Sequence, residues 1–236
     1  MSHLSVIIPA LNEGERIDLV LDHALAPLDI GAKDVIVVDG GSLDNTFELA
    51  NRRVTAIPGR RGRALQMNLG ANQTSSKWLL FCHGDSLLPP DYPRAIQATF
   101  QDSSIVGGAF TPRYHPGHPW LTLAEWLLRV PTSKLLLGDS ALFVRRSDFE
   151  AVGGFPEVPI MEDLELVQCL GSRGRWIRRP EIIVTSSRRF MERGVLRQLL
   201  LDFRLLAAYH LLRRRPEELA PHYWKTDRDR LPGEIS

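Results

Sequence analysis

The stretch VIVVDGGSLD at residues 35–44 decides how the rest of the chain is organised. Four β-branched residues in a row, without a polar interruption, are typical of a strand buried on both faces inside a parallel sheet. The run ends at Asp39, and two glycines follow, which allow a tight turn and bring backbone N–H groups close to a ligand. Asp44 is placed to cap the helix that starts near residue 45. Asp39 is therefore expected at the carboxyl end of a parallel strand, where open α/β sheets bind ligands.

Three further apolar runs predict that this strand belongs to a parallel sheet with helices on its faces. The runs are LSVII at residues 4–8, VTAI at 54–57 and WLLFC at 78–82, with helical spacing at residues 15–25 and 64–71 between them. If the first strand lies beside the fourth, Glu13, Asp39 and Asp85 surround one crevice. An ordinary strand–turn–helix in which Asp39 has only a capping role is the alternative. The convergence of acidic residues favours binding.

The second half of the chain is less regular, and its elements are expected to complete one α/β domain. Strands are predicted at residues 105–114, 141–144, 176–177 and 182–184, and helices at 120–130 and from residue 162 onward. A long helix at about 194–215 is expected to close the folded part, because Pro216 stops it. We therefore predict a domain at residues 1–215, followed by a tail at residues 216–236.

Composition excludes several classes of protein. The chain has 29 Lys and Arg against 28 Asp and Glu, a net charge of +1, which argues against nucleic acid as a partner. Two cysteines, Cys82 and Cys169, form no disulfide framework and suit a reducing compartment. No basic and apolar leader begins the chain, and no apolar run reaches membrane-spanning length. These features predict a cytoplasmic protein.

Taken in order, the motifs resemble those of the family-2 glycosyltransferases with the GT-A fold, in a small, single-domain, bacterial-type branch. The resemblance covers about residues 4–189 and depends on the order and spacing of several motifs rather than on any one of them. These motifs are VIIPALNE (6–13), VVDGGSLD (37–44), GRRGRALQMN (59–68), HGDS (83–86), GDSALFVRR (138–146), GGFP (153–156) and MEDLEL (161–166).

The resemblance implies that a nucleotide-diphosphate sugar lies across the carboxyl edge of the sheet. Pro9, Ala10 and Glu13 would line the nucleoside pocket, with Glu13 reaching the ribose. Asp39 would accept a hydrogen bond from the base, most naturally uracil N3–H, which favours a UDP-linked donor. The plainer interpretation of Glu13 is a carboxylate that stabilises the first turn of its helix.

Two arginine-bearing segments are expected to contact the diphosphate. Arg60, Arg61 and Arg63 lie on a glycine-flanked loop, and guanidinium forks suit diphosphate oxygens. For any one of them a solvated basic loop is the plainer interpretation. By resemblance, Arg188 and Arg189 would close over the diphosphate, although the longer Q-x-x-R-W pattern of processive synthases is missing there.

The HGDS motif stands where the family usually has Asp-x-Asp, so it is the expected metal site. Asp85 would bind Mg²⁺ or Mn²⁺ that bridges the diphosphate, and Gly84 is assigned to the donor site. His83 replaces the first carboxylate. A neutral imidazole there could help to bind Mn²⁺ or accept a proton from a sugar hydroxyl, or it could simply end the strand. Loss of one carboxylate should weaken the affinity for hard cations.

Glu162 and Asp163 resemble the acidic pair of the family at the start of a helix. Asp163 would be the general base that takes a proton from the acceptor hydroxyl, giving a product with inverted anomeric configuration. Gly154 and Phe155 would border the acceptor, and Asp139 would face the sugar or the acceptor. Two acidic residues that only stabilise a helix N-terminus are the alternative.

Neither the sugar nor the acceptor follows from the sequence. The apolar segment at residues 195–212, with arginines around it, either packs on its own domain or on a second copy, which is favoured, or lies on the inner face of a membrane and reaches a lipid acceptor. A binding protein without turnover and a sugar-1-phosphate nucleotidyltransferase are the competing functions. The second ranks lower, because the glycine-rich, arginine-containing loop typical of those enzymes does not follow the first strand.

Overall fold

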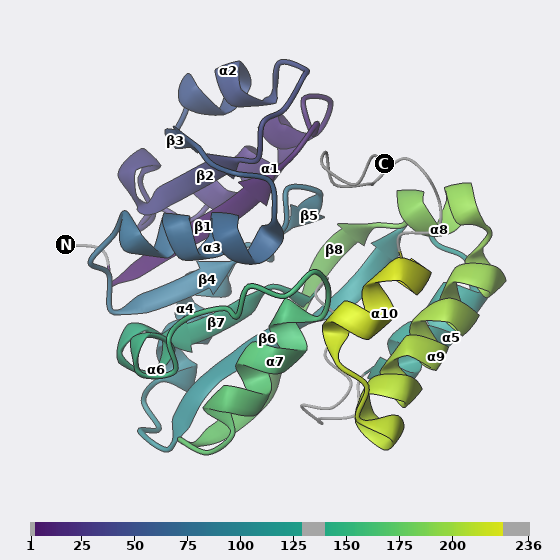
Figure 1. The fold of residues 1–236 in the computed structure, drawn as a ribbon. Coiled ribbons are helices and arrows are strands. Elements are labelled where there is room, and N and C mark those ends of the chain that lie inside the picture. Colours follow the sequence, from purple (N-terminus) through teal and green to yellow (C-terminus); the bar gives the residue numbers. More distant parts are fainter. Residues whose placement is uncertain (1–2, 129–139, 224–236) are drawn as a thin grey trace.

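An eight-stranded sheet forms the centre of the protein in this computed structural model, which describes residues 3–128 and 140–223 (Figure 1). The strands lie in the order β3-β2-β1-β4-β7-β6-β8-β5. In chain order they are β1 (Leu4–Ala10), β2 (Val35–Asp39), β3 (Thr55–Pro58), β4 (Trp78–Phe81), β5 (Ser86–Leu87), β6 (Ile105–His115), β7 (Leu142–Arg145) and β8 (Arg175–Ser186).

The first four strands form the parallel part of the sheet. β1 pairs with β2 on one side and with β4 on the other, and β2 pairs with β3. Every residue of β1 and β2 is buried, as the uninterrupted β-branched runs predict. The prediction that the first strand lies beside the fourth is confirmed, so the turns that follow β1, β2 and β4 meet at one edge of the sheet.

Helices cover both faces of the sheet, and each face has its own apolar core. One core packs α1 (Ile17–Leu25) and α4 (Tyr92–Thr99) against the sheet. On the other face lie α3 (Arg63–Asn72) and α7 (Glu162–Leu170), joined by α9 (Val195–Leu212) and α10 (Pro216–Tyr223). The remaining helices are η1 (Ala32–Asp34), α2 (Thr46–Asn51), α5 (Pro119–Leu128), α6 (Arg146–Ala151) and α8 (Arg188–Arg193).

The far half of the sheet is mixed. β7 runs antiparallel to both β4 and β6, whereas β6 and β8 pair in parallel from Ile105 opposite Arg175 to His115 opposite Ser186. The sequence predicts two short strands in the region that forms β8. The structure has one long strand, with a shift of register between Ala109 and Thr111 of its partner. Pro180 has no N–H to donate, which explains both the irregularity and the interruption of the sequence pattern.

The folded part does not end at residue 215 as predicted. α9 ends at Leu212, and Pro216 then opens a further helix, α10, instead of stopping the fold. Proline suits the first turn of a helix, because the N–H that it lacks would have no partner there. Leu219 and Ala220 of α10 are buried in the same core as Leu205 and Tyr209 of α9. The segment 216–223 is therefore part of the packed structure.

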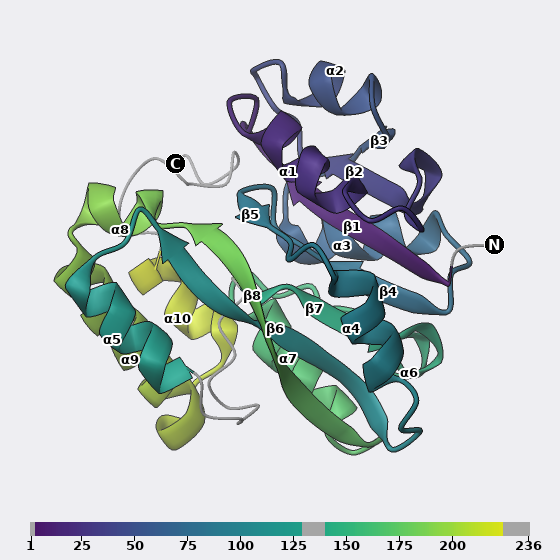
Figure 2. The same ribbon diagram turned by 180° about the vertical axis from the view of Figure 1, so that it is seen from behind.

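α5, α8 and α9 lie together at the end of the molecule farthest from β2 and β3 (Figures 1 and 2). A small cluster of Leu121, Tyr114, Phe190 and Val195 holds them to the end of β6. In the described ranges, no helix combines the length and the apolar character that crossing a bilayer would require.

Candidate functional site

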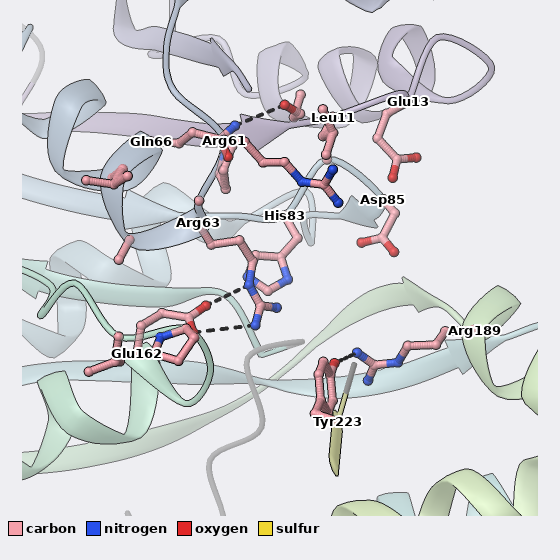
Figure 3. Close-up of a pocket in the computed structure, with 18 of the residues that line it drawn as sticks. Leu11, Glu13, Arg61, Arg63, Gln66, His83, Asp85, Glu162, Arg189 and Tyr223 are labelled. Atoms are coloured by element: carbon pink, nitrogen blue, oxygen red, sulfur yellow. Dashed lines mark hydrogen bonds and ion pairs between the residues drawn. The ribbon is translucent and has the colours of Figure 1, made fainter. Parts of the chain in front are cut away.

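A cleft of about 1090 Å³ lies at the edge of the sheet where β1 and β4 end (Figure 3). Its walls come from residues after β1, from the start of α3, from the turn after β4, from the segment leading into α7, and from α8, with Tyr223 of α10. The volume is slightly above the usual range for small-molecule sites, about 300–1,000 Å³. The cleft therefore has room for a ligand of the size of a nucleotide sugar.

Glu13 and Asp85 meet in this cleft from the ends of β1 and β4 (Figure 3). Burial and the neighbouring Asp85 carboxylate raise the pKa of Glu13 to about 7. Arg188 offsets part of this effect, with its Nη2 atom 3.3 Å from Glu13 Oε1. Among the described residues, no hydrogen-bond partner reaches the buried Oε2 atom of Glu13. The Glu13–Asp85 pair thus places two acidic groups close together, and Glu13 Oε2 is an acceptor oxygen that has no donor in the described part of the chain.

Gly84 makes this meeting possible. A Cβ atom at residue 84 would lie 3.3 Å from Glu13 Cγ and 3.3 Å from the carbonyl oxygen of Pro9. A side chain here would be tight against both, so the neighbouring atoms would have to give by a few tenths of an ångström. Glycine therefore suits this close approach of two chain segments.

The two carboxylates fit a divalent cation of the kind the resemblance implies. Mg²⁺ and Mn²⁺ prefer oxygen ligands, and the unpartnered Oε2 of Glu13 is such a ligand beside Asp85. In the part of the chain that the structure describes, no group of three or more His, Cys, Asp or Glu is arranged to hold a metal ion unaided. A cation here would complete its coordination with diphosphate oxygens or water. His83 lines the same cleft.

Arg63 and Glu162 join the two sides of the cleft. Arg63 Nε lies 2.7 Å from Glu162 Oε1, and Arg63 Nη2 donates to Oε2 at 3.4 Å. The Glu162 side chain is only 2% exposed. Burial lowers the pKa of Arg63, but the charges of Glu162, Tyr223 and Asp163 together raise it above its ordinary range. This two-point contact fixes the first turn of α3 against the first turn of α7.

Asp163 and Asp39 are not among the residues that line the cleft. Asp163 is buried in the first turn of α7 and adds to the negative potential at Arg63. The Asp39 carboxylate accepts hydrogen bonds from the N–H groups of Gly41 and Ser42 and from the Ser42 hydroxyl. Its visible role is to order the turn after β2.

The predicted site is therefore assembled in part. The residues that share the cleft are Pro9, Ala10, Glu13, Arg61, Arg63, His83, Gly84, Asp85, Glu162, Arg188 and Arg189. Arg60, Asp39 and Asp163 lie outside its lining, and Phe155 is buried in the core against Phe81 and Phe149. Asp139 lies outside the described residues.

The sequence analysis did not single out Gln66 and Tyr223, which also line the cleft. Gln66 Nε2 donates to the carbonyl oxygens of Ala10 at 2.9 Å and of Val38 at 2.7 Å, so it ties together the ends of β1 and β2. A glutamine on an otherwise buried helix face was the available signal. Tyr223 receives a hydrogen bond from Arg189 and lies under its guanidinium group, and no local pattern indicates this long-range contact.

The cleft lies at the carboxyl ends of parallel strands and is lined by carboxylates and arginines, which is the arrangement of α/β proteins that bind ligands at the edge of the sheet. The model of glycosyl transferase family 2 matches residues 5–148, more than half of the chain, and the chain belongs to this family.

Solved structures of GT-A glycosyltransferases share the fold. The mannosyltransferase PcManGT from Pyrobaculum calidifontis, in complex with GDP-Man and Mn²⁺, has a TM-score of 0.69 at 22% identity, covering 97% of this chain and 65% of that chain. Glucosyl-3-phosphoglycerate synthase from Mycobacterium tuberculosis, in complex with Mg²⁺ and UDP, has a TM-score of 0.58 at 20% identity, covering 85% and 77%. The predicted GT-A architecture is thus confirmed.

Curated relatives point to the same family. Glycosyltransferase AglE of Haloferax volcanii is 29% identical over 65% of this chain and 56% of its own length. A PGL/p-HBAD biosynthesis glycosyltransferase of Mycobacterium bovis is 26% identical over 79% of this chain and 77% of its own. The match to the archaeal relative thus spans little more than half of that protein.

Proposed function

We propose that this protein is an inverting glycosyltransferase that transfers a sugar from a nucleotide-diphosphate donor to an acceptor hydroxyl. The observation that carries the proposal is the cleft itself, where Glu13 and Asp85 face arginines from α3 and α8. Family membership and the nucleotide complexes of similar structures support it.

The nucleoside is assigned to the end of β1 and the turn after β2. Pro9 and Ala10 supply backbone and apolar surface, and Glu13 is within the same wall of the cleft. Asp39 remains our acceptor for uracil N3–H, which is the reason for favouring a UDP-linked sugar. A carboxylate has about four acceptor positions, and the turn after β2 uses three of them.

The diphosphate is assigned to the arginines of the cleft. Arg61 and Arg63 approach from the start of α3, and Arg188 and Arg189 from α8; guanidinium groups bind phosphate oxygens in pairs. Asp85 would hold the divalent cation, with Glu13 and His83 beside it. When bound, Mg²⁺ or Mn²⁺ neutralises charge on the departing nucleoside diphosphate.

Asp163 is our candidate for the general base. Glu162 is held by Arg63 through two contacts, so we give it the role of positioning Arg63 and assign proton transfer to its neighbour. Asp163 takes the proton of the acceptor hydroxyl while that oxygen bonds to the anomeric carbon. The bond from this carbon to the diphosphate oxygen breaks with its electron pair, and attack from the opposite face inverts the configuration.

Release of nucleoside diphosphate from a panel of UDP- and GDP-sugars with Mn²⁺ tests the proposal. We expect Asp163→Asn to lower kcat by about 10²–10⁴-fold while donor affinity is kept, and Asp85→Asn to weaken the response to Mn²⁺. Asp91→Asn, at an exposed position near α4, is the matched control and should behave as the wild type. The proposed activity would be refuted if no donor of the panel showed either binding or turnover.

A nucleotide-sugar-binding protein without turnover is the second candidate. Two observations favour it: His83 stands in place of a metal carboxylate, and Asp163 is not part of the cleft lining. Tight donor binding with no product in the presence of acceptors and Mn²⁺ would select it. Detectable transfer, followed by NMR of the new anomeric proton, would exclude it and report the configuration.

A further inference from the structure

Exposed apolar side chains gather at one end of the molecule. Of the twelve large hydrophobic residues that are exposed in the described chain, nine belong to α5, α8 and α9. We call these nine the outer apolar face. They are Trp120, Leu123 and Trp126 of α5, Met191 of α8, and Leu196, Leu200, Phe203, Leu211 and Leu212 of α9.

α9 is apolar on two opposite sides. Val195, Gln198, Leu205 and Tyr209 are buried against the rest of the protein. The other side carries Leu196, Leu200, Phe203 and Leu211 at spacings of three, four and eight residues, which align on one stripe of a helix. Phe203 is 70% exposed and Leu211 is 79% exposed. The packing of α9 on its own domain therefore accounts for only one of its two apolar sides.

α5 adds a second exposed stripe beside α9. Leu121 is buried with Phe190 and Val195, which joins the two helices, and they lie side by side in both views (Figures 1 and 2). Trp120, Leu123 and Trp126 follow at intervals of three residues, and Trp126 is 64% exposed. Tryptophan is the side chain most typical of the boundary between lipid and water.

The exposed charged residues of α9, and those directly after it at residues 213–215, are positive. Arg197 and Arg204 are exposed along one edge of the α9 stripe, and Arg213, Arg214 and Arg215 are exposed at its C-terminal end. The one acidic residue of α9, Asp202, accepts a hydrogen bond from Gln198. Glu218 pairs with Arg214 and Arg215, and the other three arginines form no ion pair within the described ranges. An apolar stripe with tryptophans and an arginine edge is typical of helices that lie in an anionic membrane surface.

This charge pattern disfavours a second copy of the chain as the occupant. An antiparallel two-fold contact through the α9 stripe would bring Arg197 and Arg204 of one copy close to the same arginines of the other. Like charges across an interface weaken it, whereas anionic headgroups would pair with them. We propose that the outer apolar face docks on the surface of an anionic lipid bilayer, with α9 lying along the headgroups.

Docking in this way places the cleft next to the bilayer. α8 carries Arg188 and Arg189 of the cleft at its start, and Met191 of the outer apolar face lies in the same helix. α9 begins immediately after α8. The reaction in the cleft and the binding of lipid use different residues, so the two can fail separately.

Co-sedimentation with vesicles tests the docking. We expect the wild-type protein to bind vesicles of phosphatidylcholine with phosphatidylglycerol, to bind phosphatidylcholine alone much less, and to lose binding as salt is added. Leu200→Ser with Phe203→Ser should lower the partition coefficient about tenfold or more. Arg197→Gln with Arg204→Gln should lower it about tenfold on anionic vesicles only.

Matched controls separate this surface from general effects of substitution. Leu19→Ser with Leu28→Ser removes exposed leucines elsewhere, and Arg52→Gln with Arg94→Gln removes exposed arginines of α4 and the end of α2. Both controls should bind as the wild type does, and circular dichroism should show all variants folded. The proposal is overturned if the wild type stays in the supernatant, if control and face variants lose binding equally, or if size exclusion shows a dimer that Leu200→Ser with Phe203→Ser converts to a monomer.

Discussion

Glu13 is a cleft residue whose charge is only partly compensated. Its carboxylate is partly buried beside Asp85, Arg188 contacts its Oε1 atom, and Arg16 lies close enough to lower its pKa. A bound divalent cation or a bound nucleotide-sugar donor would stabilise the charged carboxylate. In their absence, the carboxylate has to bind a proton or destabilise the fold.

The partly compensated Glu13 carboxylate should make the free energy of unfolding depend on pH. The pKa of Glu13 is about 7 in the folded protein and 4.5 as its ordinary value. A raised pKa contributes stability below the ordinary value, and this contribution is lost as the pH rises through the folded value. We expect the free energy of unfolding of the wild type, measured by urea in chelator, to fall by about 2–3 kcal/mol relative to Glu13→Gln between these two pH values. Glu15→Gln, at an exposed position, should track the wild type; parallel curves for all three would contradict the expectation.

Gln66 is the second residue with a measurable task. Its buried amide bonds to the ends of both β1 and β2. Replacement by leucine keeps the volume but removes two hydrogen bonds inside the protein, which should cost about 1–3 kcal/mol of unfolding free energy. Gln97→Leu on the exposed side of α4 should cost less than about 0.5 kcal/mol. A loss at Gln66 no larger than at Gln97 would show that the strand ends do not depend on this amide.

Local patterns located some site residues but not the orientation of all of them. Glu13 and Asp85 follow buried strands, and Arg63 follows the edge strand β3 of the same parallel sheet, so topology alone brings them to one edge. Asp39 has the same kind of position, yet N–H groups only two and three residues away hold its carboxylate. Tyr223 reaches Arg189 from the far end of the chain, a contact set by packing. A strand pattern in the sequence does not indicate which nearby N–H groups will bond to a side chain, nor which distant segments will pack against it.

At the scale of elements, the parallel strands were predictable because burial on both faces leaves an uninterrupted apolar run. β8 was harder, because Pro180 interrupts the run and the register. The sequence pattern does not predict α10, since a proline after a helix indicates an end as readily as the first turn of another helix. Its two buried residues, Leu219 and Ala220, are too few to give a clear period.

The packing of α10 makes a direct prediction. Leu219 is 5% exposed in the core that α9 also lines, so Leu219→Ala should lower the free energy of unfolding by about 2–4 kcal/mol. Leu212→Ala, at a leucine that is 70% exposed in the adjoining helix, should change it by less than about 0.5 kcal/mol. Urea denaturation checks both. Equal small effects would mean that α10 is not part of the cooperative fold.

At the scale of the whole molecule, the cleft has one wall from the parallel half of the sheet and the other from α7, α8 and α10. A ligand that contacts both walls of the cleft stabilises the packing of one wall against the other. The Arg63–Glu162 contact already bridges them at one point, and a diphosphate held by Arg63 and Arg188 would add a second.

Ligand binding should therefore raise the melting temperature. A nucleotide at about a hundred times its Kd adds about 2.7 kcal/mol to the stability of the folded state. We expect UDP with Mn²⁺ to shift the midpoint upward by several degrees, and Asp85→Asn to lose most of the part that depends on Mn²⁺. The same shift in chelator, or no shift with any nucleoside diphosphate, would contradict this use of the cleft.

The long β6–β8 pair has a consequence for the way the chain folds. Ile105 pairs with Arg175 and His115 with Ser186. Forming each pair closes a large loop, and the conformational entropy of that loop is lost before the new contacts stabilise it. Parallel pairings of this kind form slowly, whereas the β1–β2 and β2–β3 pairs join segments that are closer in sequence. The amino-terminal half can collapse while the remainder is still being synthesised, and the wall that carries Arg188 and Arg189 completes the cleft last.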